Sequence, residues 1–297
     1  MKLFIKNILY FVLGYLILNI VFYFLVFKPA IFEKYIYNEK NISEYNLFLV
    51  SDSHGAYIED VPNEFGISNL SYTGDNYLDM YLKIKYFSKK ISRKDTILLS
   101  IDNHQLSSYR EGSRNIDKSI IYSSDFSEID VSDLKKKYYL KECLKFLPFC
   151  YTDFNKMTSK FIKFNMKYNE IIPPDQSYSK LDSLSQQKAC LLRYKSQFDN
   201  KHRSENQVLY LKKIIELCAE KGIVLIGIKF PITEAYWNMI SKHDYGAEAL
   251  LRNNHIDVLD FHDLFFDKNI YFYDQDHLNT QGGKLFCLNV LSRIHKK

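Results

Sequence analysis

Three residues of this 297-residue chain have the types needed for nucleophilic catalysis at a carbonyl carbon: Ser53, Asp274 and His277. Ser53 closely follows the apolar run at 47–50, and Asp274 lies three positions before His277. One tight turn over three residues lets a carboxylate reach back to an imidazole. The carboxylate would fix the histidine tautomer and leave the other ring nitrogen free to take the serine proton. The sequence therefore predicts Ser53 as nucleophile, His277 as base and acid, and Asp274 as the residue that orients it.

Strands and helices alternate along the chain and would position these side chains. Capping signals mark one long helix, which begins after Ser204, with Gln207 three positions on, and stops at Gly222. The patterns predict strands at 47–50, 67–72, 96–101, 223–228 and 256–259, and helices at 75–90, 204–221 and 280–294. Such alternation is typical of a parallel sheet between two helical layers. We therefore expect an α/β fold, a three-layer α/β/α sandwich.

The predicted strand ends also carry candidate oxyanion donors. Ser53, Gly74 and Asn103 each follow a predicted strand. Reactive groups of parallel sheets gather at the carboxyl ends of the strands. We therefore expect the backbone N–H groups of Ser53 and Gly74 and the side-chain amide of Asn103 to face a developing negative charge.

The N-terminal segment reads as a membrane anchor. Residues 8–27 carry no charge and would form a helix about 30 Å long, which matches a bilayer core. No small-residue cleavage site follows, so the segment is expected to stay uncleaved. The sequence predicts a transmembrane anchor at 1–28, a stalk at 29–44 and an α/β domain at 45–297. Flanking lysines are nearly balanced and do not fix the orientation.

Composition excludes some partners and cofactors. The net charge of +5 is spread along the chain among acidic neighbours, so nucleic acid is not an expected partner. The five cysteines have no metal-ligand spacing, and Cys143 and Cys150 would pair only if a helix broke between them. We expect no metal and no cofactor. Residues 105–203 show no strand pattern and are predicted to form a helical insertion rich in Tyr, Phe and Lys.

These motifs resemble those of the SGNH (GDSL-like) hydrolase superfamily. The stretch 51–53, Gly74, Asn103 and the Asp-x-x-His at 274–277 correspond to its four blocks. Ser51 stands where the family has glycine, and the third block matches only loosely, which makes His104 an alternative polar donor. The resemblance covers 46–104 and 204–297 and implies acyl-ester chemistry.

An anchored domain of this kind looks like the D-alanine transfer protein of teichoic-acid modification. It is also similar to the anchored SGNH proteins that O-acylate surface polysaccharides beside a membrane-bound O-acyltransferase. The resemblance implies a single-pass protein with its catalytic domain outside the cytoplasmic membrane, an envelope glycan as substrate and a membrane acyltransferase as partner. A plain esterase with the same triad is the nearest alternative.

Two further alternatives come from other functional classes. Asp52, His54, the stretch 74–79 and the pair 103–104 resemble the first three blocks of calcineurin-like metallophosphoesterases. That family also needs a Gly-His-x-His, which the later histidines never form, and the metal hypothesis leaves Asp274 unexplained. The domain could also be a non-catalytic adaptor that docks a membrane acyltransferase through its aromatic insertion.

Overall fold

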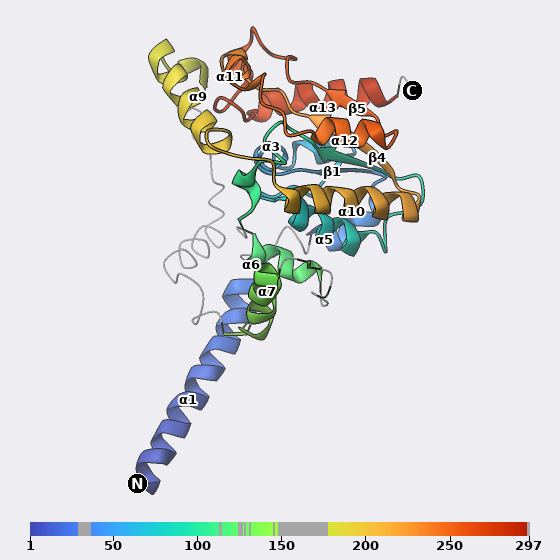
Figure 1. Cartoon of the computed structure of the whole chain (residues 1–297). Coiled ribbons are helices and arrows are strands. Elements are labelled where there is room, and N and C mark those ends of the chain that lie inside the picture. Colours follow the sequence, from blue (N-terminus) through green and yellow to red (C-terminus); the bar gives the residue numbers. More distant parts are fainter. Residues whose placement is uncertain are drawn as a thin grey trace. The chain divides into compact units, whose positions relative to one another are not determined.

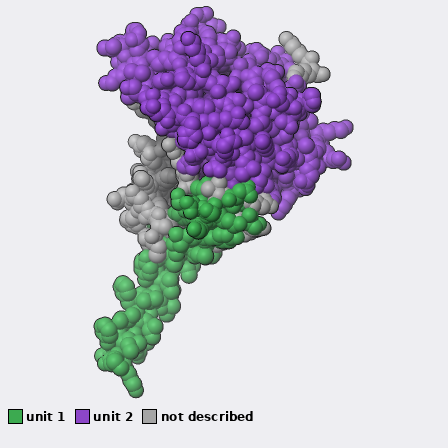
Figure 2. All heavy atoms as spheres, viewed as in Figure 1, with its two compact units in different colours: residues 1–40, 116–173 green, residues 41–115, 174–297 purple. Residues whose placement is uncertain are grey.

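The chain divides into two compact units. The computed structural model describes residues 1–28, 37–112, 115–123, 127, 129–130, 132–144, 146–147 and 178–295. Unit 1 comprises 1–40 and 116–173, and unit 2 comprises 41–115 and 174–297 (Figure 2). The predicted insertion at 105–203 thus contributes residues to both units. Residues 29–36 of the predicted stalk, residues 151–177 of the insertion, and Cys150 lie outside the described residues.

Unit 1 contains the predicted anchor. Helix α1 (Lys2–Phe22) continues into a π-helical turn, η1 (Tyr23–Phe27). The helix from Lys2 to Val26 is long and apolar enough to cross a membrane. Most of its large apolar side chains are exposed, as expected of a surface that faces lipid. Other helices of this unit include α6 (Ile116–Ser119), η4 (Ile120–Tyr122) and α7 (Ser132–Leu144).

Unit 2 is built on a five-stranded parallel sheet. Its strands are β1 (Leu47–Val50), β2 (Ser68–Asn69), β3 (Thr96–Ser100), β4 (Val224–Lys229) and β5 (Val258–Asp260). Their order is β2-β1-β3-β4-β5, and every neighbouring pair is parallel. The predicted parallel sheet is confirmed, with β2 shorter than expected. All five strands therefore end at the same edge.

Helices cover both faces of this sheet (Figure 1). Helices α5 and α10 pack together, and α13 packs against α4. The longer helices are α5 (Tyr77–Phe87), α9 (Ser183–Gln197), α10 (Glu205–Lys221) and α13 (Thr280–Ile294). The shorter ones are α3 (Ser53–Tyr57), α4 (Val61–Glu64), α11 (Glu234–Ile240) and α12 (Ala247–Asn253). Single 3₁₀ turns are η2 (Ile42–Glu44), η3 (Ser108–Arg110), η6 (Tyr178–Lys180) and η7 (Asn269–Tyr271). The three-layer α/β/α sandwich is confirmed.

Local sequence signals explain where the main elements begin and end. All four residues of β1 are buried, which matches the continuous apolar run of a strand covered on both faces. Ser204 caps α10 by accepting a hydrogen bond from the backbone N–H of Gln207 at 3.3 Å. Gly222 ends that helix with φ of 68°, a left-handed conformation that favours glycine. β4 follows directly and leads to the site. The glycine that ends α10 therefore also fixes where β4 begins.

A buried ion pair holds the loop between β2 and α5. Lys83 of α5 is 1 % exposed, and its ammonium lies 2.5 Å from the carboxylate of Asp75 and contacts the carbonyl of Leu70. Asn115 donates a further hydrogen bond to Asp75 at 2.6 Å. Because these contacts satisfy a charge that burial would otherwise penalise, they fix the loop that contains Gly74.

Candidate active site

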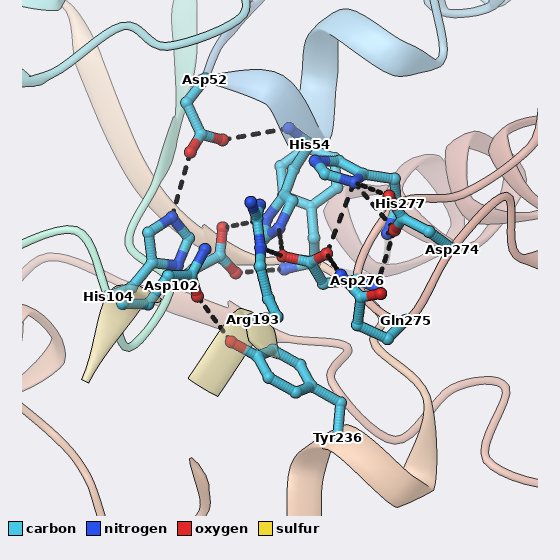
Figure 3. A network of polar contacts seen from close by, with 12 residues as sticks. Asp52, His54, Asp102, His104, Arg193, Tyr236, Asp274, Gln275, Asp276 and His277 are labelled. Atoms are coloured by element: carbon cyan, nitrogen blue, oxygen red, sulfur yellow. Dashed lines mark hydrogen bonds and ion pairs between the residues drawn. The ribbon is translucent and has the colours of Figure 1, made fainter. Parts of the chain in front are cut away.

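Polar side chains from four segments meet at the carboxyl edge of the sheet. One segment follows β1 and carries Ser53 and His54, and a second follows β3 and carries Asp102. The third is the turn at 274–277, and the fourth is α9, which supplies Arg193. Figure 3 shows these side chains, apart from Ser53, as one connected network. Segments far apart in the sequence thus form a single polar cluster.

The turn at 274–277 has the geometry of an oriented general base. The Asp274 carboxylate oxygens lie 2.8 and 2.9 Å from His277 Nδ1. The same carboxylate accepts hydrogen bonds from the backbone N–H groups of Asp276 at 3.0 Å and His277 at 2.9 Å. His277 Nε2 is buried, and no described residue gives it a hydrogen-bond partner. With Nδ1–H directed at Asp274, Nε2 is the ring nitrogen left to accept a proton.

Ser53 begins the short helix that packs against this base. Asp52 caps α3 by accepting a hydrogen bond from the His54 N–H at 3.0 Å. At the other end of α3, the Tyr57 ring stacks on the His277 ring, with centroids 4.1 Å apart. A Cβ at Gly55 would lie 2.3 Å from the Ser71 hydroxyl, so only glycine allows this close approach. The helix that starts at Ser53 is therefore held directly against His277.

His54 links three of the four segments. Its Nδ1 lies 2.8 Å from Asp102 Oδ2, its Nε2 lies 3.5 Å from Asp276 Oδ2, and its ring centroid is 5.3 Å from that of His277. Burial disfavours the charged ring, but Asp102 and Asp276 outweigh it and raise the pKa of His54 to about 9. His54 is therefore an imidazolium at neutral pH. Asp102 is itself fixed by the Phe230 N–H at 2.8 Å.

Asp276 also receives the guanidinium of Arg193. Arg193 Nε donates to Asp276 Oδ2 at 2.7 Å, and Asp276 is 1 % exposed. Burial would raise the pKa of Asp276, but the positive charge of Arg193 outweighs it and holds that pKa well below the usual range. Asp276 is thus a permanent carboxylate between two cations, Arg193 and His54.

A second buried cluster lies behind the serine turn. Asp52 forms an ion pair with Arg110. His104 Nε2 lies near both partners, 3.1 Å from Asp52 Oδ2 and 2.5 Å from Arg110 Nη2. A neutral ring nitrogen cannot donate to Asp52 and accept from Arg110 at once, so the tautomer selects one bond. Burial and the charge of His54 lower the pKa of His104 to about 3, which keeps this histidine neutral.

The predicted oxyanion donors occupy different surroundings. Gly74 has φ of 85° in the loop held by Lys83 and Asp75. Asn103 is buried, and its side-chain amide donates to the carbonyl of His243 at 2.9 Å. The Asn103 amide is thus oriented by the segment that follows α11.

Among the residues that the structure describes, two buried sets of side chains lie close enough together to hold a metal ion. They are His54, Asp276 and His277, and Asp52, His54 and Asp102. In the first set Arg193 already contacts Asp276, and in the second Arg110 contacts Asp52. The carboxylates named for the phosphoesterase alternative are used elsewhere, because Asp75 binds Lys83 and Asp79 forms a capping box with Asn76.

Sequence patterns did not single out several members of this network. Asp102 precedes Asn103 and Asp276 precedes His277 in the candidate motifs, but nothing in their spacing indicates that both contact His54. Arg193 lies in the segment predicted as an insertion, with no motif around it. The position of Arg193 depends instead on a tertiary contact, the packing of α9 against α11.

No family model and no curated protein matches the chain. Three solved structures are similar at 10–11 % identity: a protein assigned to the G-D-S-L lipolytic family from Desulfitobacterium hafniense, one assigned as an acylhydrolase from Bacteroides fragilis, and a GDSL-like lipase from Bacteroides thetaiotaomicron. They cover 82, 84 and 84 % of this chain and 96, 86 and 87 % of their own, with TM-scores of 0.37, 0.38 and 0.36.

Proposed function

We propose that this protein is a membrane-anchored serine enzyme that hydrolyses or transfers an acyl ester on a cell-envelope glycan. Ser53 is the nucleophile, His277 the base and acid, and Asp274 the residue that orients His277. The backbone N–H groups of Ser53 and Gly74 are donors to the oxyanion. An envelope glycan and a membrane-bound O-acyltransferase partner follow from the family resemblance of the anchored domain.

One observation carries the serine chemistry. His277 presents Nε2 without a hydrogen-bond partner among the described residues, while Asp274 holds Nδ1 from the other side of the ring. The helix that begins at Ser53 packs on that same ring through Tyr57. A base with its proton-accepting nitrogen free, packed through Tyr57 on the helix that Ser53 begins, supports acyl transfer with Ser53 as nucleophile.

Acyl-ester turnover tests the proposal. The detergent-solubilised full chain is expected to hydrolyse p-nitrophenyl acetate, and to keep its rate after dialysis against EDTA. The reason is that both candidate metal sets already have an arginine on one carboxylate. Initial rates before and after chelation provide the measurement. Loss of turnover with EDTA and its return with manganese would instead support two-metal phosphoesterase chemistry.

The anchor determines where the reaction takes place. If α1 spans the cytoplasmic membrane with unit 2 outside, a C-terminal alkaline phosphatase fusion is expected to be active, and a C-terminal cytoplasm-only fluorescent reporter dark. The N-terminus is also expected to remain on the mature chain, since no cleavage site follows residue 27. Reporter activity and N-terminal sequencing provide the measurements. A bright cytoplasmic reporter would contradict both the topology and the envelope-glycan substrate.

A further inference from the structure

We propose that Arg193 is a further catalytic residue, whose guanidinium donates hydrogen bonds to the oxyanion formed when Ser53 attacks the ester carbonyl. The inference rests on the proposed function, because it assigns a donor to that same reaction. Sequence motifs offered Asn103 or His104 as the side-chain donor. The contacts of α9 favour Arg193 instead.

Arg193 is held at the centre of the site by its own anchors. Nε donates to Asp276 Oδ2 at 2.7 Å. With its amide oxygen turned toward Arg193, Gln197 accepts from Nε at 2.9 Å and from Nη2 at 3.1 Å, and its nitrogen then donates to Tyr236 at 2.6 Å. Figure 3 shows the Arg193 side chain reaching into the network beside Asp276. A guanidinium fixed along one edge is preorganised, so it need not reorient as charge develops.

The opposite edge of the guanidinium remains available. The Arg193 side chain is 21 % exposed, and no described residue offers an acceptor to Nη1. Asp276, which holds Nε on the anchored edge, also reaches the base, because its Oδ1 lies 3.4 Å from His277 Nδ1. It also joins Arg193 to the residue after Ser53, because Oδ2 lies 3.5 Å from His54 Nε2. Asp276 therefore links Arg193 to the base and to the residue that follows the nucleophile, while no described residue uses the Nη1 N–H groups.

Asn103 has a different task in this arrangement. Its amide donates to the His243 carbonyl at 2.9 Å, and His243 Nε2 lies 3.2 Å from the hydroxyl of Tyr194, the next residue along α9. Tyr194 and Phe198 of α9 also contact the His243 ring. Asn103 therefore acts as a positioning residue, since it holds the segment against which α9 sets Arg193.

The competing explanation is that Arg193 only neutralises Asp276. A buried carboxylate needs a compensating cation, and its removal costs stability even when the cation has no chemical role. His54 already lies on the same carboxylate, 3.5 Å from Oδ2. Contact with Asp276 uses Nε, and the Nη1 N–H groups have no acceptor among the described residues, so Arg193 keeps donors for a second anion.

The chemical step assigns each bond and proton. Ser53 Oγ forms a bond to the carbonyl carbon, its proton moves to His277 Nε2, and the carbonyl π pair becomes the oxyanion that Arg193 receives. The pair then re-forms the C=O bond, the bond to the leaving oxygen breaks, and that oxygen takes the proton from His277. Water or an acceptor hydroxyl reverses the sequence on acyl-Ser53 and releases the serine.

Four variants of the full chain in detergent test the assignment, with p-nitrophenyl acetate as substrate. Arg193→Gln is expected to lower kcat by about 10²–10³-fold with little change in KM, as for loss of one oxyanion donor. Arg193→Lys keeps the charge beside Asp276 but loses the planar fork, so a fall of at least about tenfold is expected. Arg252→Gln, which removes an exposed arginine paired with Glu248 outside the site, is the matched control and should keep wild-type kcat.

The double variant Arg193→Gln, Asp276→Asn separates the two explanations. It has no carboxylate to neutralise, so a purely compensating arginine predicts that kcat recovers, whereas an oxyanion donor predicts that it stays low. Recovery, or wild-type kcat in Arg193→Gln, would overturn the assignment.

Labelling by a fluorophosphonate gives a second readout, because its phosphoryl oxygen occupies the oxyanion position. Arg193→Gln should slow the labelling. If Arg193→Gln does not fold, the Lys variant decides by the same two readouts. A wild-type chain that neither turns over ester nor takes the label would instead overturn the proposed function.

Discussion

Replacing Ser53 with alanine is expected to lower acyl-ester turnover by at least about 10³-fold while the protein stays folded. The substitution deletes one hydroxyl from the first residue of α3. That hydroxyl does not cap the helix, because the cap is provided by the Asp52 side chain. Alanine also has a high helix propensity. The chemistry should therefore be lost without a change in thermal midpoint, and initial rates with circular dichroism melting measure both.

Ser88→Ala is the matched control for this experiment. Ser88 ends α5, and its hydroxyl donates to the carbonyl of Lys85 at 2.8 Å, outside the polar cluster at the sheet edge. We expect it to cost about 1 kcal/mol of stability at most and to keep the wild-type rate. Comparable rate loss in both variants would show that serine removal acts through folding, and a fully active Ser53→Ala would end the serine hypothesis.

The sheet could be predicted because its signals are local. Each central strand is a short apolar run, and 47–50 coincides with β1 to the residue. Helix α10 is bounded by a serine cap and a left-handed glycine, and α13 begins at the expected Thr280. The second strand was overestimated, because only two residues of 67–72 pair with β1. Apolar character predicted burial there but did not fix the length of the pairing.

The site could be predicted only where its residues share a motif. Asp274 and His277 lie on one turn, so their contact follows from spacing alone. The bond between His54 and Asp102 joins the ends of two strands, and the bond between Arg193 and Asp276 joins residues 83 positions apart. Such pairs depend on strand order and on how α9 packs, which local patterns do not encode. The pairing of these buried charges therefore could not be predicted from the sequence and is seen only in the folded structure.

Replacing Asp274 with asparagine is expected to lower kcat by about 10²–10⁴-fold with little effect on substrate affinity. The Asp274 carboxylate accepts from His277 Nδ1 and from two backbone N–H groups. An amide keeps one oxygen for the turn, but its NH₂ can face the ring only as a donor. That pairing favours the tautomer with the proton on Nε2, which cannot accept from Ser53. The expected result is a folded protein with the wrong nitrogen protonated, measured by kcat and thermal midpoint.

The chain provides two comparisons that make this result decisive. Asp260 forms a similar pair with another histidine, His262, at 2.7 Å, but at the end of β5, outside the site. Asp260→Asn should therefore keep kcat within about threefold, whatever it costs in stability.

The second comparison is Asp102→Asn, because Asp102 holds the Nδ1 of His54 at 2.8 Å, and His54 adjoins Ser53 in the sequence. If Asp102→Asn abolished turnover while Asp274→Asn preserved it, the base would be His54 rather than His277. The raised pKa of His54 argues against that outcome, since an imidazolium at neutral pH has no lone pair with which to take the serine proton.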